Sequence, residues 1–549
     1  MRSLYTLLLV ALLLVSRLYV QPFYSLISDC DETFNYWEPL NFLLRGFGKQ
    51  TWEYSPDYSI RSWAFLMPLY AGLAPLGKIV TSLGLPPSTL FYLARAGLGL
   101  YSFSMEWLLF RELESSLSVK TANLWLFVQL FNPGWFHASV ELLPSSFAMV
   151  TIIGFLKYFL RYLSSGSQSA FVQALVFNFV SGILGWPFVL ILSTPLVVHF
   201  VVTHKIWATI NAGFASLSKL VIVAVCVFGI DSAFYGKFTP VAWNIVMYNV
   251  IAADEKSGPN IFGVEPWYYY PLNLLLNFPL PTLMACTVGM VTNMRLASVW
   301  ASLLIWMAVF LLQPHKEERF LYPIYAVITL AASVGLTNVW KRLPTWKHIR
   351  NLITFALYVF IAVQGSMRIL ALVTNYTAPL DVYANLPEVS GPQTICVGRE
   401  WYHFPTSMFL AKDSRLGFIE SGFDGLLPGD FKETHSILNS IREIPFGMNN
   451  QNQFDSSKLV SADQCDYYID FMLRSEDPRD ALDPTRLSED WKCIYKIPFI
   501  DVSQSKFLGR AFAVPEKILA VLPLQNYWSR FYQANYLDYC IFEKQTEEA

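Results

Sequence analysis

The stretch of sequence that decides the fold is residues 4–39. Residues 4–20 read LYTLLLVALLLVSRLYV, which is about long enough to cross a bilayer as a helix. Residues 29–39 read DCDETFNYWEP and begin with three carboxylates beside this apolar segment. Acidic groups next to lipid are costly unless they pair, face water or take part in chemistry. Because aromatic rings stack on the apolar faces of sugars, the stretch indicates a membrane, acid or base chemistry, and carbohydrate.

The composition is that of an integral membrane protein. Of the 549 residues 54% are hydrophobic and only 15% are charged, and the mean hydropathy is +0.38. Soluble domains carry about 25% charged residues. The net charge of -2 comes without a basic run that would suit nucleic acid, so no nucleic-acid partner is expected. Seven cysteines occur without a CxxC pair or a Cys/His cluster, so no metal site is expected.

Apolar segments of spanning length recur as far as residue 373. We predict eleven membrane helices at 4–21, 88–110, 121–139, 146–163, 170–186, 187–203, 208–230, 271–292, 297–313, 320–338 and 351–373. The stretch 62–84 is also apolar, but prolines and glycines interrupt it, so we interpret it as a juxtamembrane or re-entrant element. Residues 4–21 lack a small-x-small cleavage pattern, which favours an uncleaved first helix with a cytosolic N-terminus over a signal peptide.

The basic loops define a topology for these spans. Eleven spans place the basic residues of the loops near 111–120, 157–161, 204–205, 295 and 341–350 in the cytosol, as the positive-inside rule requires, and the cluster at 341–350 is the strongest. The opposite side receives loops 22–61, 139–145, 231–270 and 314–319, and everything from residue 374 onward. We therefore predict a transmembrane catalytic domain over 1–373 and a lumenal mixed α/β domain over 374–549, with strands near 394–397, 467–472 and 536–542.

Two features of the tail concern covalent modification. Asn375 begins the sequon Asn-Tyr-Thr and is a candidate glycosylation acceptor close to the membrane. Cys396, Cys465, Cys493 and Cys540 lie in the same oxidising compartment and are candidates for disulfides. The sequence leaves their pairing open, and buried free thiols are the alternative.

The three acidic residues of the first loop are expected to have different roles. Asp29 alone is typical of a solvated cap. Asp31 and Glu32 precede a run rich in Phe, Tyr and Trp that would partly bury them. Burial raises the pKa of a carboxylate and suits it to general-base catalysis near neutral pH. We therefore expect the pair to be functional.

A second charged group is His315-Lys316-Glu317-Glu318-Arg319-Phe320, between two predicted spans. One interpretation is interfacial, with Lys and Arg reaching toward water and pairing with the glutamates. The other is an anion site that binds a phosphate at the membrane surface. The topology puts this group on the same face as Asp31, which favours the anion site.

Other residues on that face form a tentative substrate-binding set. Glu141 lies at a helix entry, where a helix cap is the alternative. Glu265 and Trp267 lie in the aromatic loop 262–270, where an interfacial belt is the alternative. The first loop adds Trp37, Glu38, Trp52, Glu53 and Tyr54.

These segments together resemble the family 22 glycosyltransferases of the GT-C class, which are polytopic enzymes of the endoplasmic reticulum that use dolichyl-phosphate mannose. The family pattern has an Asp-Glu pair in the first lumenal loop, here Asp31-Glu32. It also has a His-Lys-Glu-x-Arg-Phe motif, here 315–320, and a Leu-Pro-x-x-Phe turn, here 143–147. Within the family the chain is most similar to the α-1,2-mannosyltransferase branch of N-glycan precursor assembly, through 29–39, 50–56, 58–62, 265–268 and 395–402.

The resemblance implies a specific reaction. Mannose would pass from β-linked dolichyl-phosphate mannose to the lumenal dolichyl-diphosphate-linked oligosaccharide in α-1,2 linkage, at two stages and with inversion. Asp31 is the expected base, and Glu32 is the second choice or a partner that holds the acceptor. His315, Lys316 and Arg319 would bind the donor phosphate. No metal or other cofactor is expected. The implied fold is a GT-C helical bundle in the endoplasmic-reticulum membrane, with membrane lipids around it and a lumenal active site.

Two other readings remain open at this stage. A sister α-1,6-mannosyltransferase or a glycolipid-anchor (GPI) mannosyltransferase would share the motifs, although the tail resembles these less. A polytopic transporter would place acids and bases at mid-bilayer within broken helices. Here the charged groups lie in loops on one face, which weakens that reading. The sequence does not indicate an oligomeric state.

Overall fold

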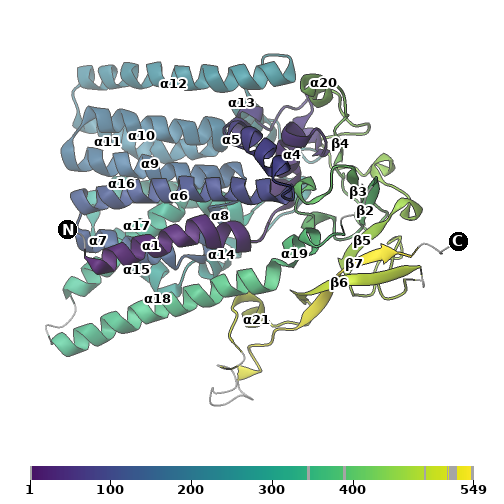
Figure 1. The fold of residues 1–549 in the computed structure, drawn as a ribbon. Coiled ribbons are helices and arrows are strands. Elements are labelled where there is room, and N and C mark those ends of the chain that lie inside the picture. Colours follow the sequence, from purple (N-terminus) through teal and green to yellow (C-terminus); the bar gives the residue numbers. More distant parts are fainter. Residues whose placement is uncertain are drawn as a thin grey trace.

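Long helices run side by side through the molecule, and a smaller mixed domain covers one end of them (Figure 1). The computed structural model describes residues 3–342, 346–387, 391–487, 490–515, 517 and 528–545. The N-terminus lies at the end of the bundle opposite the C-terminal domain (Figure 1). The predicted fold class, a helical membrane bundle with a C-terminal α/β domain, is confirmed.

The helices of the bundle and its loops follow the apolar segments of the sequence. Their bounds are α1 Leu4–Val15, α2 Gln21–Tyr24, α3 Cys30–Glu32, α4 Glu38–Arg45, α5 Trp63–Ser82, α6 Ser88–Ser116, α7 Val119–Leu130, α8 Pro133–Ala138, α9 Pro144–Ser165, α10 Gln168–Val180, α11 Thr194–Thr203, α12 Ile206–Tyr235, α13 Val241–Val246, α14 Tyr269–Asn277, α15 Leu280–Thr292, α16 Ala297–Leu312, α17 Tyr325–Arg342 and α18 Lys347–Tyr376.

The number of membrane crossings differs from the eleven predicted. Within the described residues, eight helices are long and apolar enough to cross a membrane, or nine if α14 and α15, bent by 108°, form one span. The predicted span 121–139 is divided into α7 and α8 at Asn132-Pro133, because proline cannot continue the hydrogen bonding of a helix interior. The predicted span 187–203 is a shorter apolar helix.

The stretch 62–84 forms one continuous helix, α5, despite Pro68 and Pro75. By length and composition alone it is a candidate span. The start of α5 packs on the first loop, with the rings of Trp63 and Tyr54 4.6 Å apart. The start of α6 packs there too, with Phe91 4.6 Å from Trp37. Both helices begin on the first loop, and the interpretation of 62–84 as a juxtamembrane or re-entrant element stays a prediction.

The bundle is held by close backbone approach and by one buried ion pair. A Cβ on Gly335 of α17 would lie 1.9 Å from the carbonyl oxygen of Ala285 in α15, so only glycine allows this helix contact. Arg17, which follows α1, donates to both carboxylate oxygens of Glu106 in α6 at 2.9 and 2.8 Å. Both side chains are buried, so each charge is stabilised by the other.

The C-terminal domain is built on a five-stranded sheet of order β3-β2-β5-β7-β6. Its elements are α19 Ala378–Ala384, β2 Gln393–Val397, β3 Ser414–Phe418, β4 Gly429–Asp430, α20 Ile437–Arg442, β5 Tyr467–Phe471, β6 Trp491–Ile500, α21 Phe507–Ala511 and β7 Tyr536–Lys544. Strands β3, β2 and β5 are parallel, and β7 is antiparallel to both of its neighbours. The strands expected near 394–397, 467–472 and 536–542 correspond to β2, β5 and β7. Of the four tail cysteines, Cys396 and Cys465 form a disulfide, whereas Cys493 and Cys540 are free.

The first loop and the C-terminal domain form one structural unit. Strand β1 (Lys49–Gln50) of the first loop pairs antiparallel with β4 of the domain. Phe34 packs on Phe404 and Phe418 at 6.2 and 6.1 Å between ring centroids. Their side chains belong to a single buried cluster. The domain therefore fixes the position of the loop that carries Asp31.

Candidate active site

The two charged motifs of the sequence meet in the structure. Arg319 Nη2 lies 2.7 Å from Asp31 Oδ2, and its Nη1 lies 3.2 Å from Asp29 Oδ2. Glu317 forms a third ion pair with the same guanidinium. Residues separated by 288 positions thus form one polar site at the end of the bundle covered by the C-terminal domain.

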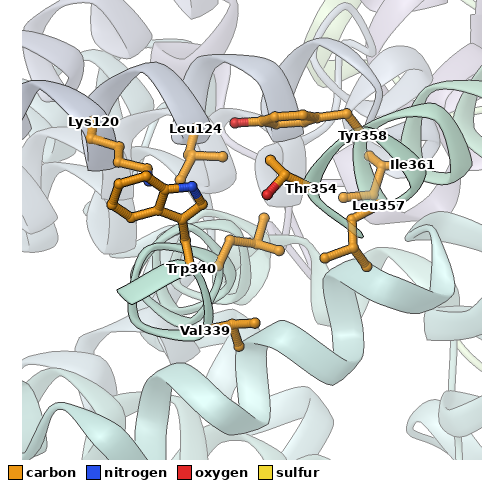
Figure 2. A pocket seen from close by; sticks show the side chains of 9 residues that line it. Lys120, Leu124, Val339, Trp340, Thr354, Leu357, Tyr358 and Ile361 are labelled. Carbon is orange, nitrogen blue, oxygen red and sulfur yellow. The ribbon is translucent and has the colours of Figure 1, made fainter. Parts of the chain in front are cut away.

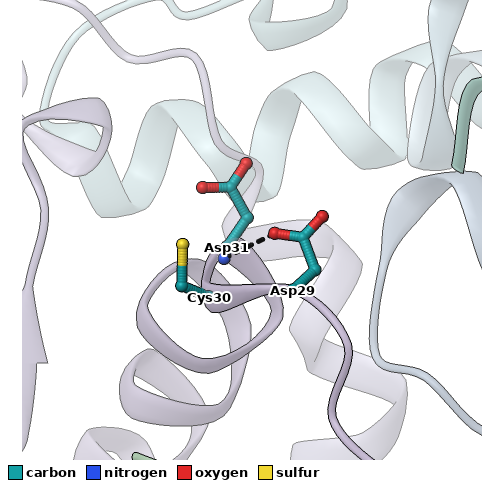
Figure 3. Close-up of side chains that lie close together, drawn as sticks. All are labelled: Asp29, Cys30 and Asp31. Atoms are coloured by element: carbon teal, nitrogen blue, oxygen red, sulfur yellow. Dashed lines mark hydrogen bonds between the residues drawn. The ribbon is translucent and has the colours of Figure 1, made fainter. Parts of the chain in front are cut away.

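Local structure positions the two aspartates. Asp29 caps the short helix α3, its carboxylate accepting a hydrogen bond from the backbone N–H of Asp31 at 2.9 Å (Figure 3). Asp29 was expected to be a solvated cap. It is a cap, but it is partly buried and paired with Arg319, so it belongs to the site.

Asp31 lies between two arginines. Arg61 Nη2 is 3.3 Å from Asp31 Oδ2, and the same guanidinium pairs with Glu53 at 2.7 Å and donates to the Tyr36 hydroxyl at 2.9 Å. Sequence reasoning missed Arg61 as a site residue. The available signal was an arginine among the acids of one loop, inside the stretch 58–62.

One oxygen of Asp31 stays available. The side chain is 31% exposed, against 15% for Arg319 and 18% for Arg61. Both ion pairs engage Oδ2, and Oδ1 makes no hydrogen bond or ion pair within the described part of the chain. A carboxylate held by one oxygen and open at the other has the geometry that a general base requires.

Burial and charge shift the pKa values around Arg319 in opposite directions. Burial raises the pKa of Asp29 to about 7, with Arg319 opposing and Asp31 adding to the rise. Burial also acts to raise the pKa of Glu317, but Arg319 and His315 outweigh it and lower that pKa to about 2. Asp29 can therefore take up a proton near neutral pH.

Glu32 has a structural position. It is fully buried, and its Oε1 accepts hydrogen bonds from Trp37 Nε1 at 2.7 Å and from the backbone N–H of Leu142 at 2.9 Å. Burial raises its pKa to about 8, with Glu141 adding to the rise and Arg95 opposing it. Glu32 ties the first loop to the turn before α9, and its burial removes it from direct contact with a substrate. The structure gives Glu32 a supporting position, and its role as the second choice of base stays a prediction.

Two members of the predicted phosphate site bind protein groups instead. Lys316 is 6% exposed, and its ammonium donates to backbone carbonyls, including that of Glu265 at 2.9 Å. His315 contacts the carbonyl oxygen of Gly263 at 2.7 Å and Glu317 at 2.9 Å. Both residues hold the loop 259–270 in place. Arg319 is the one cation of the predicted set whose guanidinium faces the Asp31 carboxylate.

Behind these groups lies a buried polar layer that joins α8, α9 and the segment after the motif. His137 lies 3.0 Å from Glu318 and 3.2 Å from the Tyr322 hydroxyl. Glu141 accepts hydrogen bonds from Ser28 at 2.9 Å and Ser146 at 3.1 Å. The helix-entry role expected as the alternative for Glu141 fits this burial better than substrate binding.

Three of the tentative substrate-binding residues are buried supports. Trp37 donates to Glu32, and the Tyr54 hydroxyl donates to the backbone carbonyl of Asn35 at 2.7 Å. Glu38 accepts hydrogen bonds from Thr406, from Ser407 and from the backbone N–H of Lys49. All three side chains are fully buried and bind protein groups, so their contact with substrate stays a prediction that this burial does not favour.

Of the other candidates, Trp52 and Glu53 are also buried, whereas Glu265 and Trp267 are exposed. Trp52 packs on Tyr58 and Tyr248, with ring centroids 5.0 and 5.2 Å apart. Glu53 pairs with Arg61, as described above. Glu265 is exposed, and Trp267 in the same loop is 71% exposed. These two residues have the free surface that a sugar or a lipid requires.

The sequon lies inside the fold. Asn375 is 1% exposed, its amide nitrogen approaches the carbonyl oxygen of Gly509 at 3.5 Å, and its amide oxygen accepts from Tyr536 at 2.9 Å. The folded protein therefore hides Asn375 from a glycosylating enzyme.

Two aspartates and a cysteine lie close enough together to hold a metal ion. Asp29, Cys30 and Asp31 offer three ligand atoms within 4.8 Å of one another, and Figure 3 shows their side chains projecting from the start of α3. Both carboxylates already pair with Arg319, whose positive charge opposes a cation at this place. The expectation that no metal is required stays a prediction.

Comparison with known proteins identifies the family. The model of the Alg9-like mannosyltransferase family matches residues 8–411. The chain belongs to this family. The α-1,2-mannosyltransferase ALG9 of Saccharomyces cerevisiae is 52% identical over 99% of this chain and 98% of that protein. The human ALG9 is 33% identical over 89% of this chain and 83% of that protein. The GPI mannosyltransferase 3 of Candida albicans is 25% identical over 56% of this chain and 59% of that protein.

The family assignment confirms the resemblance found in the sequence. The match 8–411 includes the Asp31–Glu32 pair, the 143–147 turn and the 315–320 motif. Among solved structures, ArnT from Cupriavidus metallidurans bound to undecaprenyl phosphate has a TM-score of 0.52 at 13% identity, covering 76% of this chain and 86% of that one. At this identity the likeness concerns the fold alone.

Proposed function

We propose that this chain is a mannosyltransferase that forms an α-1,2 linkage, with dolichyl-phosphate mannose as donor and a lumenal dolichyl-diphosphate-linked oligosaccharide as acceptor. The identity of 52% with the ALG9 of Saccharomyces cerevisiae, over nearly the whole of both chains, supports this activity. The single structural observation that carries the chemistry is Asp31, held by Arg319 on one oxygen and open on the other.

In the proposed reaction Asp31 takes the proton from the acceptor hydroxyl as that oxygen attacks the anomeric carbon of mannose. The new bond forms on the face opposite the phosphate, and the bond between the anomeric carbon and the phosphate oxygen breaks with its electron pair. A β-linked donor thus gives an α-linked product. The leaving group is dolichyl phosphate, whose growing negative charge requires a cation at the interface.

Arg319 is the proposed phosphate contact. It is now shared among Asp29, Asp31 and Glu317, so an incoming phosphate competes with three carboxylates for its donors. The raised pKa of Asp29 supports an exchange in which Asp29 takes up a proton and its ion pair with Arg319 breaks. The guanidinium nitrogen of Arg319 is then free to bind the phosphate. We propose that His315 and Lys316 act indirectly, by fixing the exposed loop with Glu265 and Trp267 next to this place.

The setting of the reaction is part of the proposal. The chain is a multi-pass membrane protein, and we place it in the endoplasmic reticulum with the Asp31 site in the lumen. The acceptor is extended at two stages of precursor assembly. The weaker match to the GPI mannosyltransferase makes the glycolipid-anchor alternative less well supported. A transporter would not account for the Asp31–Arg319 pair at one end of the bundle.

The experiment is a linkage assay on the purified protein. Radiolabelled dolichyl-phosphate mannose and a synthetic lipid-linked acceptor are incubated with the wild type and with Asp31→Asn. The product should lose its label to an α-1,2-specific mannosidase, and the variant should lose at least about a hundredfold in turnover, which is the usual contribution of a general base. Label that resists the mannosidase would contradict the linkage, and near-normal turnover of Asp31→Asn would contradict the role of Asp31.

A further inference from the structure

A hollow opens at the end of the bundle opposite the candidate active site. It is small, is partly open to the surroundings, and lies between α7, α17 and α18 (Figure 2). Its walls are mainly apolar and come from Leu124, Leu336, Val339, Leu357, Tyr358 and Ile361. Apolar walls of this kind suit contact with a hydrocarbon chain.

One cation, Lys120, lines this hollow, and two more, Arg350 and Lys341, lie close to Lys120. The Lys120 ammonium lies over the ring of Trp340, and the Arg350 guanidinium lies 4.9 Å from the centroid of the same ring. Lys341 follows Trp340 in α17. None of the three cations forms an ion pair with a described residue, and the buried Nε of Arg350 has no hydrogen-bond partner there. The rim of the hollow therefore carries positive charge that the described protein does not neutralise.

The electrostatics of Lys120 agree with this geometry. Burial lowers the pKa of Lys120 to about 8, and the neighbouring Arg350 and Lys341 lower it further in the same sense. Clustering like charges in a partly enclosed place costs free energy unless an anion is bound there. An anionic ligand would relieve that repulsion.

We propose that this hollow binds one anionic glycerophospholipid, with an acyl chain between α7, α17 and α18 and the phosphate between Lys120 and Arg350. Charge complementarity selects an anionic lipid over a neutral one, and the apolar walls select a lipid over a soluble phosphate. The proposed lipid site is separate from the proposed site of the lipid-linked substrates, because the two lie at opposite ends of the bundle. Helix α18, which begins near the hollow and ends at Tyr376, is 30 residues and therefore about 45 Å long.

The test measures the melting temperature of the full-length protein in detergent as phosphatidylserine or phosphatidylcholine is added. Phosphatidylserine should stabilise the wild type at lower concentration than phosphatidylcholine. The double variant Lys120→Ala/Arg350→Ala should bind phosphatidylserine about thirtyfold more weakly, because each cation near a membrane surface contributes about a fivefold gain in affinity.

Two further variants separate the parts of the proposal. Thr354→Trp keeps the cations but fills the hollow, since Thr354 lines it. This variant should lose the response to phosphatidylserine, and it also serves if the double variant does not fold. The matched control is Lys205→Ala, an exposed cation in the turn between α11 and α12 at the same end of the bundle (Figure 1). It should respond as the wild type does.

Three results would overturn the proposal. Equal stabilisation by the two lipids would show an apolar slot without charge selectivity. An equal loss in Lys205→Ala would show that the positive surface as a whole attracts the lipid. An unchanged response in Thr354→Trp would show that no acyl chain occupies the hollow.

Discussion

Replacing Arg61 by Gln tests how Asp31 is held. The substitution removes the ion pair at 3.3 Å to Asp31, the pair at 2.7 Å to Glu53 and the hydrogen bond to Tyr36. Arg319 remains at 2.7 Å from Asp31, so the carboxylate keeps one ion pair and stays in the site. Without Arg61, however, its orientation is less restricted. A hydrogen bond to a charged group contributes about 1.5–3 kcal/mol. If this stabilisation is lost mainly from the transition state, kcat falls roughly 10- to 150-fold.

The assay compares kcat and KM for the purified enzyme with dolichyl-phosphate mannose. We expect KM for the donor to change less than about threefold, because Arg319 is intact and Arg61 makes no contact with the proposed phosphate position. The control is Arg45→Gln. Arg45 lies in the same loop but donates to the backbone carbonyls of Ser407 and Leu410 at 2.6 and 2.9 Å. It should lower the melting temperature and leave kcat of the folded fraction near normal.

The reasoning fails if kcat of Arg61→Gln stays within twofold of the wild type. It also fails if the loss in Arg61→Gln equals that in Arg45→Gln at the same melting temperature, because the effect would then be general destabilisation. Arg61→Lys should recover part of the activity, since an ammonium can replace one of the two ion pairs but not the fork of hydrogen bonds.

The other predictions concern binding, docking, pH and the disulfide. Arg319→Ala should weaken binding of a dolichyl phosphate analogue at least about tenfold in a competition assay, and more than Lys316→Ala does, because Lys316 is bound to carbonyls. Glu38→Ala should destabilise the protein by about 3–5 kcal/mol and make the C-terminal domain sensitive to protease, since four hydrogen bonds end on that buried carboxylate. Burial raises the pKa of Glu32 from 4.5 to about 8, so the folded protein keeps a proton that the unfolded chain releases. The melting temperature should therefore fall as pH rises from about 5 to 8. Glu32→Gln should make the melting temperature less dependent on pH over this range. Replacing Cys396 and Cys465 by Ser should cost about 4 kcal/mol, as expected for a loop closed over 69 residues, and denaturant unfolding of the domain would measure it.

The juxtaposition of Asp31 and Arg319 was predictable from the sequence. Loops on the same side of a membrane protein are restricted to one thin layer, so two polar motifs with the same topology have a high chance of meeting. The strands of the tail were predictable for a similar reason, because runs of β-branched and aromatic residues between turns have few alternatives.

The roles of individual acids and aromatic residues were not predictable. Glu38, Trp37 and Tyr54 have the composition of a sugar site, yet they are buried because the C-terminal domain packs on the first loop. That contact joins residues more than 350 positions apart, such as Glu38 and Thr406. The sequence around each residue does not indicate such a contact. The same limit explains why Lys316 was expected at a phosphate and instead holds the loop that contains Glu265.

The pairing of β1 with β4 has a consequence for how the protein is made. Lys49 leaves the ribosome about 380 residues before its partner Asp430. At about 5–20 residues per second, the first loop waits roughly 20–80 s for the strand that completes it. During this interval Glu38 lacks Ser407, and the Asp31 segment lacks the surface on which Phe34 packs. We therefore expect nascent chains shorter than about 430 residues to be inactive, and to present an unpaired edge and exposed aromatic rings to chaperones.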